Sequence, residues 1–311
     1  MAKHLRIALI GRGRWGRNIE KTLRGLSQCT LAYVAERDYR ALIAKKDIDA
    51  VIVATPGSTH ARVALPFIKR SLPVFIEKPL TTNLRDAGMI KKAAEKSGSL
   101  IFVGHLHHYN PAYLKTKELI QKIGKIRFMV AEGSNNGPYR NDMSALWDWA
   151  PHDIYMMVDL VGSLPKSLQA WGVSSLRPKT ILHDIGYIKL NFKNGVTGFI
   201  FNSWLFPEKR KKLTVVGEKS SIVFDDTASQ KVTLYKNMGP QIIKKSVIQK
   251  EPKILYPKYD TASPLTAELK AFISAVQNGT KPKTGIQEGL TIVKTLDAAE
   301  KSIKSSKLIR I

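Results

Sequence analysis

The stretch LRIALIGRGRWGRNIEKTLRGL, residues 5–26, decides how the chain begins to fold. Its first six residues are almost all apolar, which is typical of a strand buried in a parallel sheet. The glycines of GRGRWG follow at once, and the residues after them have the spacing of an amphipathic helix. A strand, a glycine turn and a helix in this order predict a nucleotide-binding element.

The glycine turn has the spacing that accommodates a pyrophosphate. The first glycine permits a tight turn, the second lets a phosphate approach the backbone, and the third permits close packing of helix on strand. The positive end of the helix then favours the anion, and the arginines of the turn add charge. We expect this turn to contact a dinucleotide through Gly11, Gly13, Arg14, Trp15 and Gly16.

The sequence leaves the choice between NAD and NADP open. An acidic residue at the end of the second strand would bind the adenosine ribose, whereas an arginine there would accommodate an extra phosphate. The stretch TLAYVAERD offers both, as Glu36 and Arg37. The chain then enters AVIVATP so soon that no full helix and strand fit between. We therefore predict an abbreviated parallel sheet on the adenosine side.

Apolar runs alternate with amphipathic stretches over the first 121 residues. After the opening strand, AVIVATP, PVFIEKP and LIFVGH are predicted strands, and helices are predicted between them. This alternation predicts an α/β Rossmann domain over residues 1–121, with a parallel sheet covered on both faces.

The pattern changes in the second part of the chain. From Lys125 to about Tyr256, short strands joined by turns are interrupted by one helical stretch, which we expect to begin near His152. Two amphipathic helices follow, and we expect them to pack back toward the first domain. Residues 122–311 are thus predicted to form an α+β substrate and oligomerisation domain with an open, mainly antiparallel sheet.

The composition narrows the classes of partner. The chain has 50 Lys and Arg against 25 Asp and Glu, a net charge of +25. The basic residues are spread over predicted helix faces and accompany no nucleic-acid-binding signature, so we expect a small anionic substrate and no nucleic acid. The single cysteine excludes intramolecular disulfides. Without a signal-peptide pattern or a long apolar run, we expect a cytoplasmic protein with no membrane contact.

The stretch LWDWAPHD, residues 146–153, carries a carboxylate and an imidazole four residues apart. Histidine suits proton transfer at neutral pH because its unperturbed pKa lies there. Read alone, Asp148 and His152 could also belong to a capped turn. We expect Asp153 to be a first-turn helix residue that interacts with the helix dipole.

The motifs GRGRWG, ATPGSTH, EKP and WDWAPH stand in an order and spacing that resemble the glucose-fructose oxidoreductase, inositol dehydrogenase and MocA family. The resemblance covers nearly the whole chain. The stretch LWDWAPHD is most similar to the corresponding stretch of members that act on sugar nucleotides. It implies hydride transfer between NAD or NADP and a secondary alcohol of a sugar, in a homo-oligomer (a dimer or tetramer) without a metal. One substrate that it suggests is the 3-hydroxyl of a UDP-N-acetyl sugar.

The resemblance also implies roles for particular residues. Lys78, Asp148 and His152 match the catalytic set, with His152 as general base and Lys78 stabilising the charge on the reacting oxygen. A cis bond before Pro79 is expected as in the family. The segments implied to lie near the cofactor add Thr55, Pro56, His60, Glu77 and Lys78, and the predicted substrate contacts are His105, Tyr139, Arg140, Asp148 and His152. Tyr139 and Arg140 are included because they lie just upstream of LWDWAPHD, and a plain loop role is the alternative for them.

The histidines of GHLHHYN raise the question of a metal. We expect His105 and His107 to share one face of a strand, but no carboxylate partner is evident, and no metal site is predicted. His105 is the histidine of this stretch expected to line the cofactor cleft.

Two other functions fit the same sequence. The chain could work mainly as an NADPH-dependent reductase of a keto sugar or an imine. It could also be a catalytically silent nucleotide-binding or scaffold protein, which the shortened region after the second strand favours. The presence of Lys78, Asp148 and His152 together argues against the second alternative.

Overall fold

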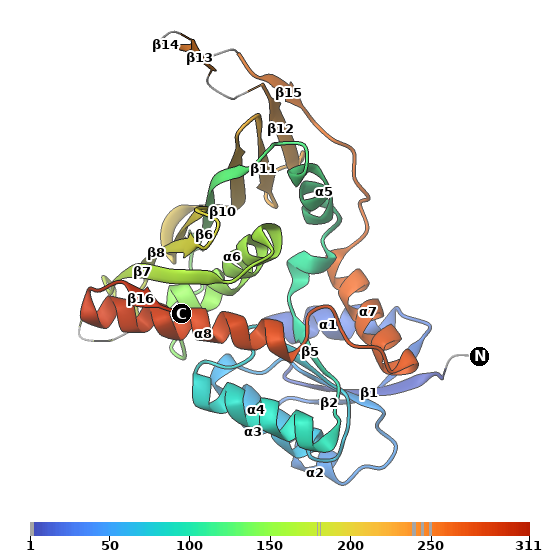
Figure 1. The fold of residues 1–311 in the computed structure, drawn as a ribbon. Coiled ribbons are helices and arrows are strands. Elements are labelled where there is room, and N and C mark those ends of the chain that lie inside the picture. The colour runs from blue at the N-terminus through green and yellow to red at the C-terminus, as the bar shows by residue number, and fades with distance from the viewer. Residues whose placement is uncertain (1–2, 179, 181, 238–240, 244–245, 249–250) are drawn as a thin grey trace. The chain divides into compact units, whose positions relative to one another are not determined.

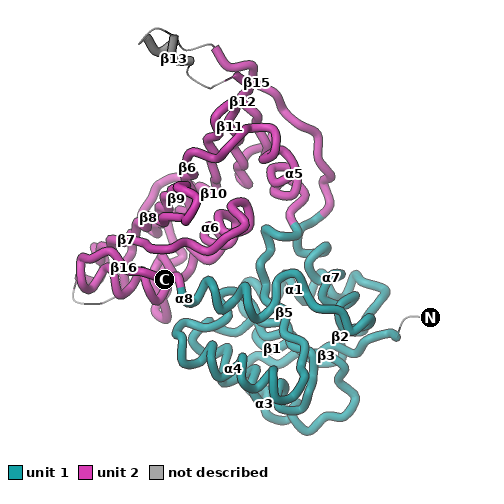
Figure 2. The backbone as a smooth tube through the Cα atoms, in the orientation of Figure 1, with its two compact units in different colours: residues 1–109, 263–294 teal, residues 110–262, 295–311 magenta. Residues whose placement is uncertain are grey.

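The protein is described by a computed structural model that covers residues 3–178, 180, 182–237, 241–243, 246–248 and 251–311. The chain divides into two compact units (Figure 2). The first comprises residues 1–109 and 263–294, and the second comprises residues 110–262 and 295–311. None of the helices among the described residues combines the length and the apolar character that crossing a bilayer requires.

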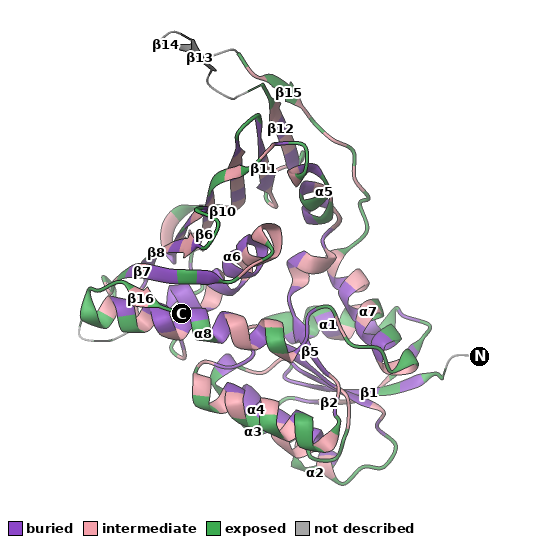
Figure 3. Ribbon diagram, in the orientation of Figure 1, coloured by how far each residue is buried: buried purple, intermediate pink, exposed green. Residues whose placement is uncertain are grey.

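The first unit is built on a sheet of five parallel strands in the order β2-β1-β3-β4-β5 (Figure 1). The strands are β1 (Leu5–Ile10), β2 (Cys29–Ala35), β3 (Ala50–Val53), β4 (Val74–Glu77) and β5 (Ile101–Gly104). All residues of the last three are buried (Figure 3), as expected where helices cover both faces. The predicted Rossmann-type sheet is confirmed.

Helices cover this sheet on both faces (Figure 1). Helices α1 (Arg14–Arg24) and α7 (Pro264–Asn278) lie on one face, and α3 (His60–Ile68) and α4 (Leu84–Ser97) lie on the other. Two 3-10 turns, η1 (Gly57–Thr59) and η2 (Leu106–Tyr109), follow β3 and β5. Phe272 of α7 packs edge-on against Phe75 and Phe102, so a helix distant in sequence completes this core.

The sheet is abbreviated after β2, as predicted. Only one helical turn, α2 (Arg40–Ile43), lies between β2 and β3. Because β3 pairs with β1 rather than with β2, β2 remains the edge strand.

The second unit is built on a nine-stranded sheet in the order β15-β12-β11-β10-β6-β9-β8-β7-β16. Every neighbouring pair is antiparallel except β6 and β9, which confirms the predicted mainly antiparallel sheet. Its strands are β6 (Ile126–Asn136), β7 (Pro165–Val173), β8 (Ile185–Phe192), β9 (Thr197–Ser203), β10 (Leu205–Gly217), β11 (Ser220–Asp225), β12 (Val232–Lys236), β15 (Lys253–Leu255) and β16 (Ile309–Arg310). Strands β13 (Gln241–Ile243) and β14 (Ser246–Ile248) pair separately.

Helix α6 (Ala145–Val161) packs on β6, β8 and β9 of this sheet. A side-chain carbon at Gly186 would lie 2.4 Å from the Leu146 side chain, and one at Gly198 would lie 2.6 Å from Met157 Sδ. Glycine at these two strand positions therefore lets the helix approach the sheet closely.

The division into compact units differs from the predicted boundary at residue 121. Helix α5 (Pro111–Ile120) contacts β11 and β12, so it lies with the second unit. Helix α8 (Ile286–Ser305) contributes its residues up to 294 to the first unit and the rest to the second.

Candidate functional site

The carboxyl ends of β1, β2 and β3 meet at one edge of the parallel sheet. The Gly11 amide donates to the Ala35 carbonyl at 2.8 Å, and the Ala54 amide donates to the Ile10 carbonyl at 2.8 Å. In the sheet, β2 lies on one side of β1 and β3 lies on the other, so the strand order reverses at β1. Such a reversal of strand order is where parallel sheets bind nucleotides.

The glycine turn at this edge leaves no room for larger residues at two of its positions. Gly11 has φ +100°, and a side-chain carbon there would lie 2.5 Å from the Ala54 carbonyl oxygen. A side-chain carbon at Gly16 would lie 2.0 Å from the Gly11 carbonyl oxygen. Both obstacles are backbone atoms, which cannot rotate away.

Gly13 differs from these two glycines because the space around it is open. It precedes α1 as its N-cap, and a side-chain carbon there would meet no atom within 4 Å. Open space before the first turn of a helix suits a pyrophosphate group. Arg14 and Trp15 follow in the first turn, and both are exposed. The turn therefore fits a dinucleotide, which Gly11, Gly13 and Gly16 would hold by backbone approach.

The end of β2 presents both residues considered for the adenosine side. The Glu36 side chain is 63% exposed, and its carboxylate lies 3.6 Å from the Arg12 guanidinium. Arg12 also donates to Glu20 at 2.7 Å, and Arg37 is exposed. A carboxylate and a guanidinium are thus both accessible at this strand end.

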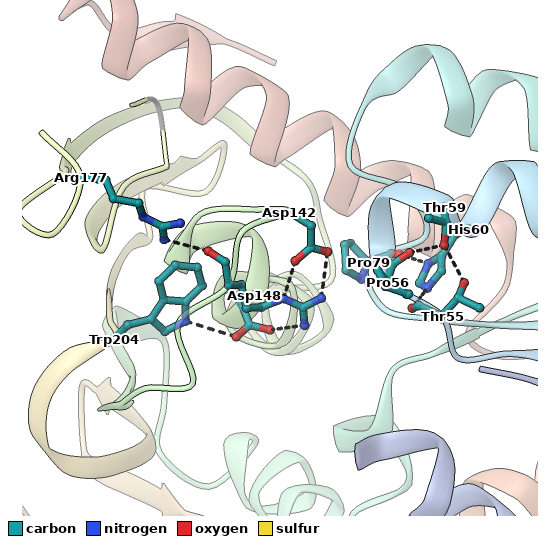
Figure 4. A network of polar contacts seen from close by, with 10 residues as sticks. Thr55, Pro56, Thr59, His60, Pro79, Asp142, Asp148, Arg177 and Trp204 are labelled. Atoms are coloured by element: carbon teal, nitrogen blue, oxygen red, sulfur yellow. Dashed lines mark hydrogen bonds and ion pairs between the residues drawn. The ribbon is translucent and has the colours of Figure 1, made fainter. Parts of the chain in front are cut away.

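The segment after β3 contains Thr55, Pro56 and His60, which were expected near the cofactor (Figure 4). His60 Nε2 lies 2.9 Å from the Thr55 carbonyl oxygen, and His60 Nδ1 lies 2.9 Å from the Pro79 carbonyl oxygen. The Thr59 hydroxyl donates to the Thr55 hydroxyl oxygen at 2.8 Å. His60 is only 1% exposed, so its contacts with the chain's own backbone join the ends of β3 and β4.

The EKP motif begins at Glu77, the last residue of β4, and its Lys78–Pro79 peptide is cis, as expected from the resemblance. The Trp15 indole donates to Glu77 Oε1 at 2.5 Å, and the Lys78 amide donates to Glu77 Oε2 at 3.2 Å. Burial raises the pKa of Glu77 to about 7, although the indole bond and the charge of Lys78 act in the opposite direction. Glu77 is therefore a buried acceptor between the glycine turn and the lysine.

His105 follows β5 and is 1% exposed. Burial, with smaller contributions from the charges of His108 and Lys78, lowers the pKa of His105 to about 3, so the ring is neutral. The expectation that His105 and His107 share a strand face is wrong, because β5 ends at Gly104 and η2 begins at Leu106. Among the described residues, no three His, Cys, Asp or Glu side chains are grouped to hold a metal.

Helix α6 of the second unit begins seven residues earlier than His152, at Ala145, which corrects the predicted start. The Ala145 amide donates to the His183 carbonyl at 2.8 Å, and most residues from 145 to 157 are buried. This packing on the sheet outweighs the loss of one helical hydrogen bond at Pro151, which lies inside the helix. A proline inside a helix is uncommon, which is why the sequence suggested a later start.

The corrected start changes the roles of the two aspartates. Asp148 lies in the first turn of α6, where a carboxylate interacts favourably with the helix dipole. Asp153, which was expected there, is instead buried and accepts from the Asn202 side-chain amide at 2.9 Å. Asp148 and His152 are four residues apart on one helix face, and both remain partly exposed on a mostly buried helix.

Asp148 is held by residues from outside its helix (Figure 4). The Trp204 indole donates to Asp148 Oδ2 at 3.3 Å, and an Arg140 nitrogen lies 3.6 Å from Asp148 Oδ1. Burial opposes the charged form of Arg140, but its bonds to Asp142 and the charge of Asp148 outweigh burial and raise the Arg140 pKa. Trp204 and Asp142 could not be predicted from the sequence, because neither belongs to a recognised motif.

The remaining predicted substrate contact, Tyr139, is 49% exposed, and its hydroxyl donates to Asn136 Oδ1 at 2.6 Å. Arg177 contacts the same loop, because it donates to the Arg140 carbonyl at 2.8 Å and to Asn141 Oδ1 at 2.7 Å (Figure 4). The loop therefore presents a phenol beside a guanidinium that is already paired with carboxylates.

Two family models match the chain. One describes an oxidoreductase family with an NAD-binding Rossmann fold and matches residues 17–105, and the other describes the C-terminal alpha/beta domain of that family and matches residues 133–311. The Gfo/Idh/MocA models thus cover most of both units.

Similar proteins include a myo-inositol 2-dehydrogenase of Thermotoga maritima, 24% identical over 99% of this chain and 98% of the relative. A UDP-N-acetylglucosamine 3-dehydrogenase of Acidithiobacillus ferrooxidans is 23% identical over 68% of this chain and 71% of that protein. A solved structure from Magnetospirillum magnetotacticum, assigned to the oxidoreductases, is 31% identical, with a TM-score of 0.81 over 95% of this chain and 99% of that one.

Proposed function

We propose, from the premise that the chain belongs to the Gfo/Idh/MocA family of NAD-binding oxidoreductases, that it oxidises a secondary alcohol of a sugar or a sugar nucleotide. The observation that carries the proposal is the placement of Asp148 and His152, four residues apart, on the partly exposed face of α6. A carboxylate and an imidazole on one accessible helix face can orient a substrate hydroxyl and take its proton.

In the proposed reaction the substrate hydroxyl loses its proton to His152. Asp148, in the first turn of α6, orients the substrate hydroxyls and favours the charged form of His152 once the proton has moved. Lys78 stabilises the negative charge that develops on the reacting oxygen. The nicotinamide supplies the hydride acceptor.

The substrate class is supported by the similar proteins and by the charge of the chain. One relative is named for myo-inositol and another for UDP-N-acetylglucosamine. The net charge of +25 favours approach of an anionic substrate, and a nucleotide sugar is anionic whereas inositol is not. We therefore propose a sugar nucleotide as the first substrate to test, with the 3-hydroxyl of a UDP-N-acetyl sugar as the reacting group.

The test follows NAD reduction by the purified protein with UDP-N-acetylglucosamine, free N-acetylglucosamine and myo-inositol. We expect turnover with the nucleotide sugar and a loss of about 10²–10⁴-fold in kcat for His152→Ala and for Lys78→Ala. The matched control is His4→Ala, because His4 is an exposed histidine whose ring lies 2.8 Å from the Thr30 hydroxyl, at the opposite end of β1 from the glycine turn. Turnover that survives His152→Ala would remove the base assignment.

The same assay separates the alternative functions. If the protein transfers hydride only from NADPH to a keto sugar or an imine, its function is reduction and not oxidation of an alcohol. Binding of NADH without turnover of any substrate in either direction would indicate a nucleotide-binding or scaffold protein.

We also propose that the chain forms a homo-oligomer through the uncovered face of its nine-stranded sheet. Trp171, Tyr187 and Phe201 are register partners on β7, β8 and β9, and Trp171 and Tyr187 are each 50% exposed. An apolar row of this kind is typical of an interface. By light scattering, Tyr187→Glu should yield a smaller species than wild type, whereas Tyr256→Glu, at an exposed tyrosine beyond β15, should not. An unchanged mass for Tyr187→Glu would contradict this interface.

A further inference from the structure

Two glutamates are buried in the first unit, and no basic side chain among the described residues is hydrogen-bonded to either. Glu77 is 7% exposed and ends β4, and Glu268 is fully buried on α7. Glu268 lies on the helix face that also carries Leu265, Leu269 and Phe272, which belong to the apolar core. A carboxylate in such surroundings is costly unless hydrogen bonds satisfy it.

The two carboxyl groups differ in their hydrogen-bond donors. Glu77 accepts from the Trp15 indole at 2.5 Å and from the Lys78 amide at 3.2 Å. Neither oxygen of Glu268 has a hydrogen-bond partner among the residues that the structure describes. These donors offset part of the cost of burying a charge at Glu77, whereas none does so at Glu268, so of the two glutamates Glu77 is the one that ionises first.

The Glu77 carboxyl group lies against the backbone of the neighbouring strand. A side-chain carbon at Gly104, on the neighbouring strand β5, would lie 3.1 Å from the Glu77 carboxyl carbon and 3.1 Å from Oε2. The glycine thus makes room for the carboxyl group at the end of β5. In this position Glu77 bonds the first turn of α1 through the Trp15 indole.

The other charged and titratable groups of the neighbourhood are Lys78, His105, Tyr109 and Glu288. Lys78 follows Glu77, and its charge favours the Glu77 carboxylate. The charge of Glu77 in turn raises the pKa of Glu268, after the larger effect of burial. Tyr109 of η2 interacts with Glu268 and with Glu288 of α8, and neutral His105 interacts with Lys78.

We propose that Glu77 and Glu268 together carry a single negative charge, located on Glu77, and that this charge positions Trp15 and the glycine turn for the dinucleotide. The pair acts through Trp15, so both glutamates are positioning residues. The proposal concerns dinucleotide binding and does not rest on the substrate named above.

Protonation of Glu77 should weaken dinucleotide binding. A neutral carboxyl group accepts the indole N–H less strongly than a carboxylate does, and the difference amounts to about tenfold in affinity. Because the pKa of Glu77 is raised to about 7, the change falls in a pH range where the protein can be studied.

The experiment measures NADH affinity of the full chain by fluorescence between about pH 6 and pH 8.5, the range that brackets a midpoint near neutrality. We expect wild-type affinity to rise severalfold, up to about tenfold, across this range. Glu77→Gln and Trp15→Phe should bind with the weaker, low-pH affinity at every pH. In the absence of NADH, the fluorescence difference between wild type and Trp15→Phe should show the same midpoint.

Two further variants locate the charge. Glu268→Gln imitates a protonated glutamate, so the midpoint should stay where it is in wild type; a downward shift would show that Glu268 carries charge. The matched control is Glu300→Gln, because Glu300 accepts from the Trp147 indole at 3.1 Å in the second unit. That variant should keep the wild-type pH profile.

Wild-type affinity and pH profile in Glu77→Gln would overturn the proposal. If Glu268→Gln does not fold, Glu77→Gln and Trp15→Phe still decide it. NADH binding without pH dependence, together with sugar oxidation, would reject the pair and leave the proposed function standing.

Discussion

The strand-end edge of the first unit and helix α6 of the second unit hold their polar residues by different means. At the edge, backbone atoms of neighbouring strands fix the geometry, as in the bonds from Gly11 to Ala35 and from Ala54 to Ile10. On α6, side chains from remote positions do so, as Trp204 does for Asp148 and Asn202 for Asp153. A site fixed by backbone tolerates side-chain changes except where a glycine is required, whereas a site fixed by side chains can be altered one contact at a time.

The comparison predicts its largest effect at a glycine of the edge. Gly16→Ala would place a methyl group 2.0 Å from the Gly11 carbonyl oxygen, and the backbone must shift to relieve this contact. We expect NADH affinity to fall at least about a hundredfold, because the turn can no longer keep its shape. Calorimetric titration measures this loss.

Gly13→Ala is the matched control, because a methyl group there would meet no protein atom within 4 Å. It should fold as wild type and lose affinity only through contact with the dinucleotide. Equal melting temperatures for wild type and Gly16→Ala, with equal affinity, would show that the edge is not fixed as described.

A second effect concerns the stability of the strand-end edge, where Glu77 ends β4. The pKa of Glu77 is raised from 4.5 to about 7 by burial, so between these values the folded protein holds a proton that the unfolded chain has released. The free energy of unfolding of wild type relative to Glu77→Gln should therefore fall as the pH rises from about 4.5 to about 7. The fall is on the order of 3 kcal/mol.

Urea unfolding of both proteins at a series of pH values gives this difference. Above about pH 7 it should become constant, because Glu77 is then ionised in both states. If the free energy of unfolding of wild type relative to Glu77→Gln rises with pH instead, the fold lowers the pKa of Glu77 and the prediction is wrong.

The smallest effect is expected on α6. Trp204→Phe removes the donor to Asp148 Oδ2 but keeps an aromatic ring at a fully buried position, and Arg140 remains 3.6 Å from the other oxygen. We expect kcat/KM to fall about three- to tenfold, consistent with the loss of one hydrogen bond to a charged group. NADH affinity should stay unchanged.

Trp147→Phe serves as the control for this substitution, because Trp147 donates to Glu300 and not to Asp148 among the bonds of the described residues. It should cost stability without lowering kcat/KM. Equal losses of kcat/KM in both variants would show that Trp204 acts through packing alone.

The sequence predicts the strand-end edge better than helix α6, because the edge depends on local motifs and α6 depends on remote contacts. Strand, glycine turn and helix are adjacent in sequence, so residues 5–26 indicate the parallel sheet, and the short link before AVIVATP indicates the missing helix and strand. The start of α6 could not be predicted, because Pro151 argues locally against a helix that its packing on β6, β8 and β9 stabilises.

By itself, the sequence determined the fold class, the family and the position of Lys78 at a strand end, since each depends on periodicity or on the order and spacing of motifs along the chain. Only the tertiary structure decided that Asp148, rather than Asp153, lies in the first turn of α6. It also decided that Glu268, nearly 200 residues from Glu77, is buried near enough for their charges to interact. The physical reason is that burial and electrostatic interaction depend on distance in space, which motif spacing does not encode.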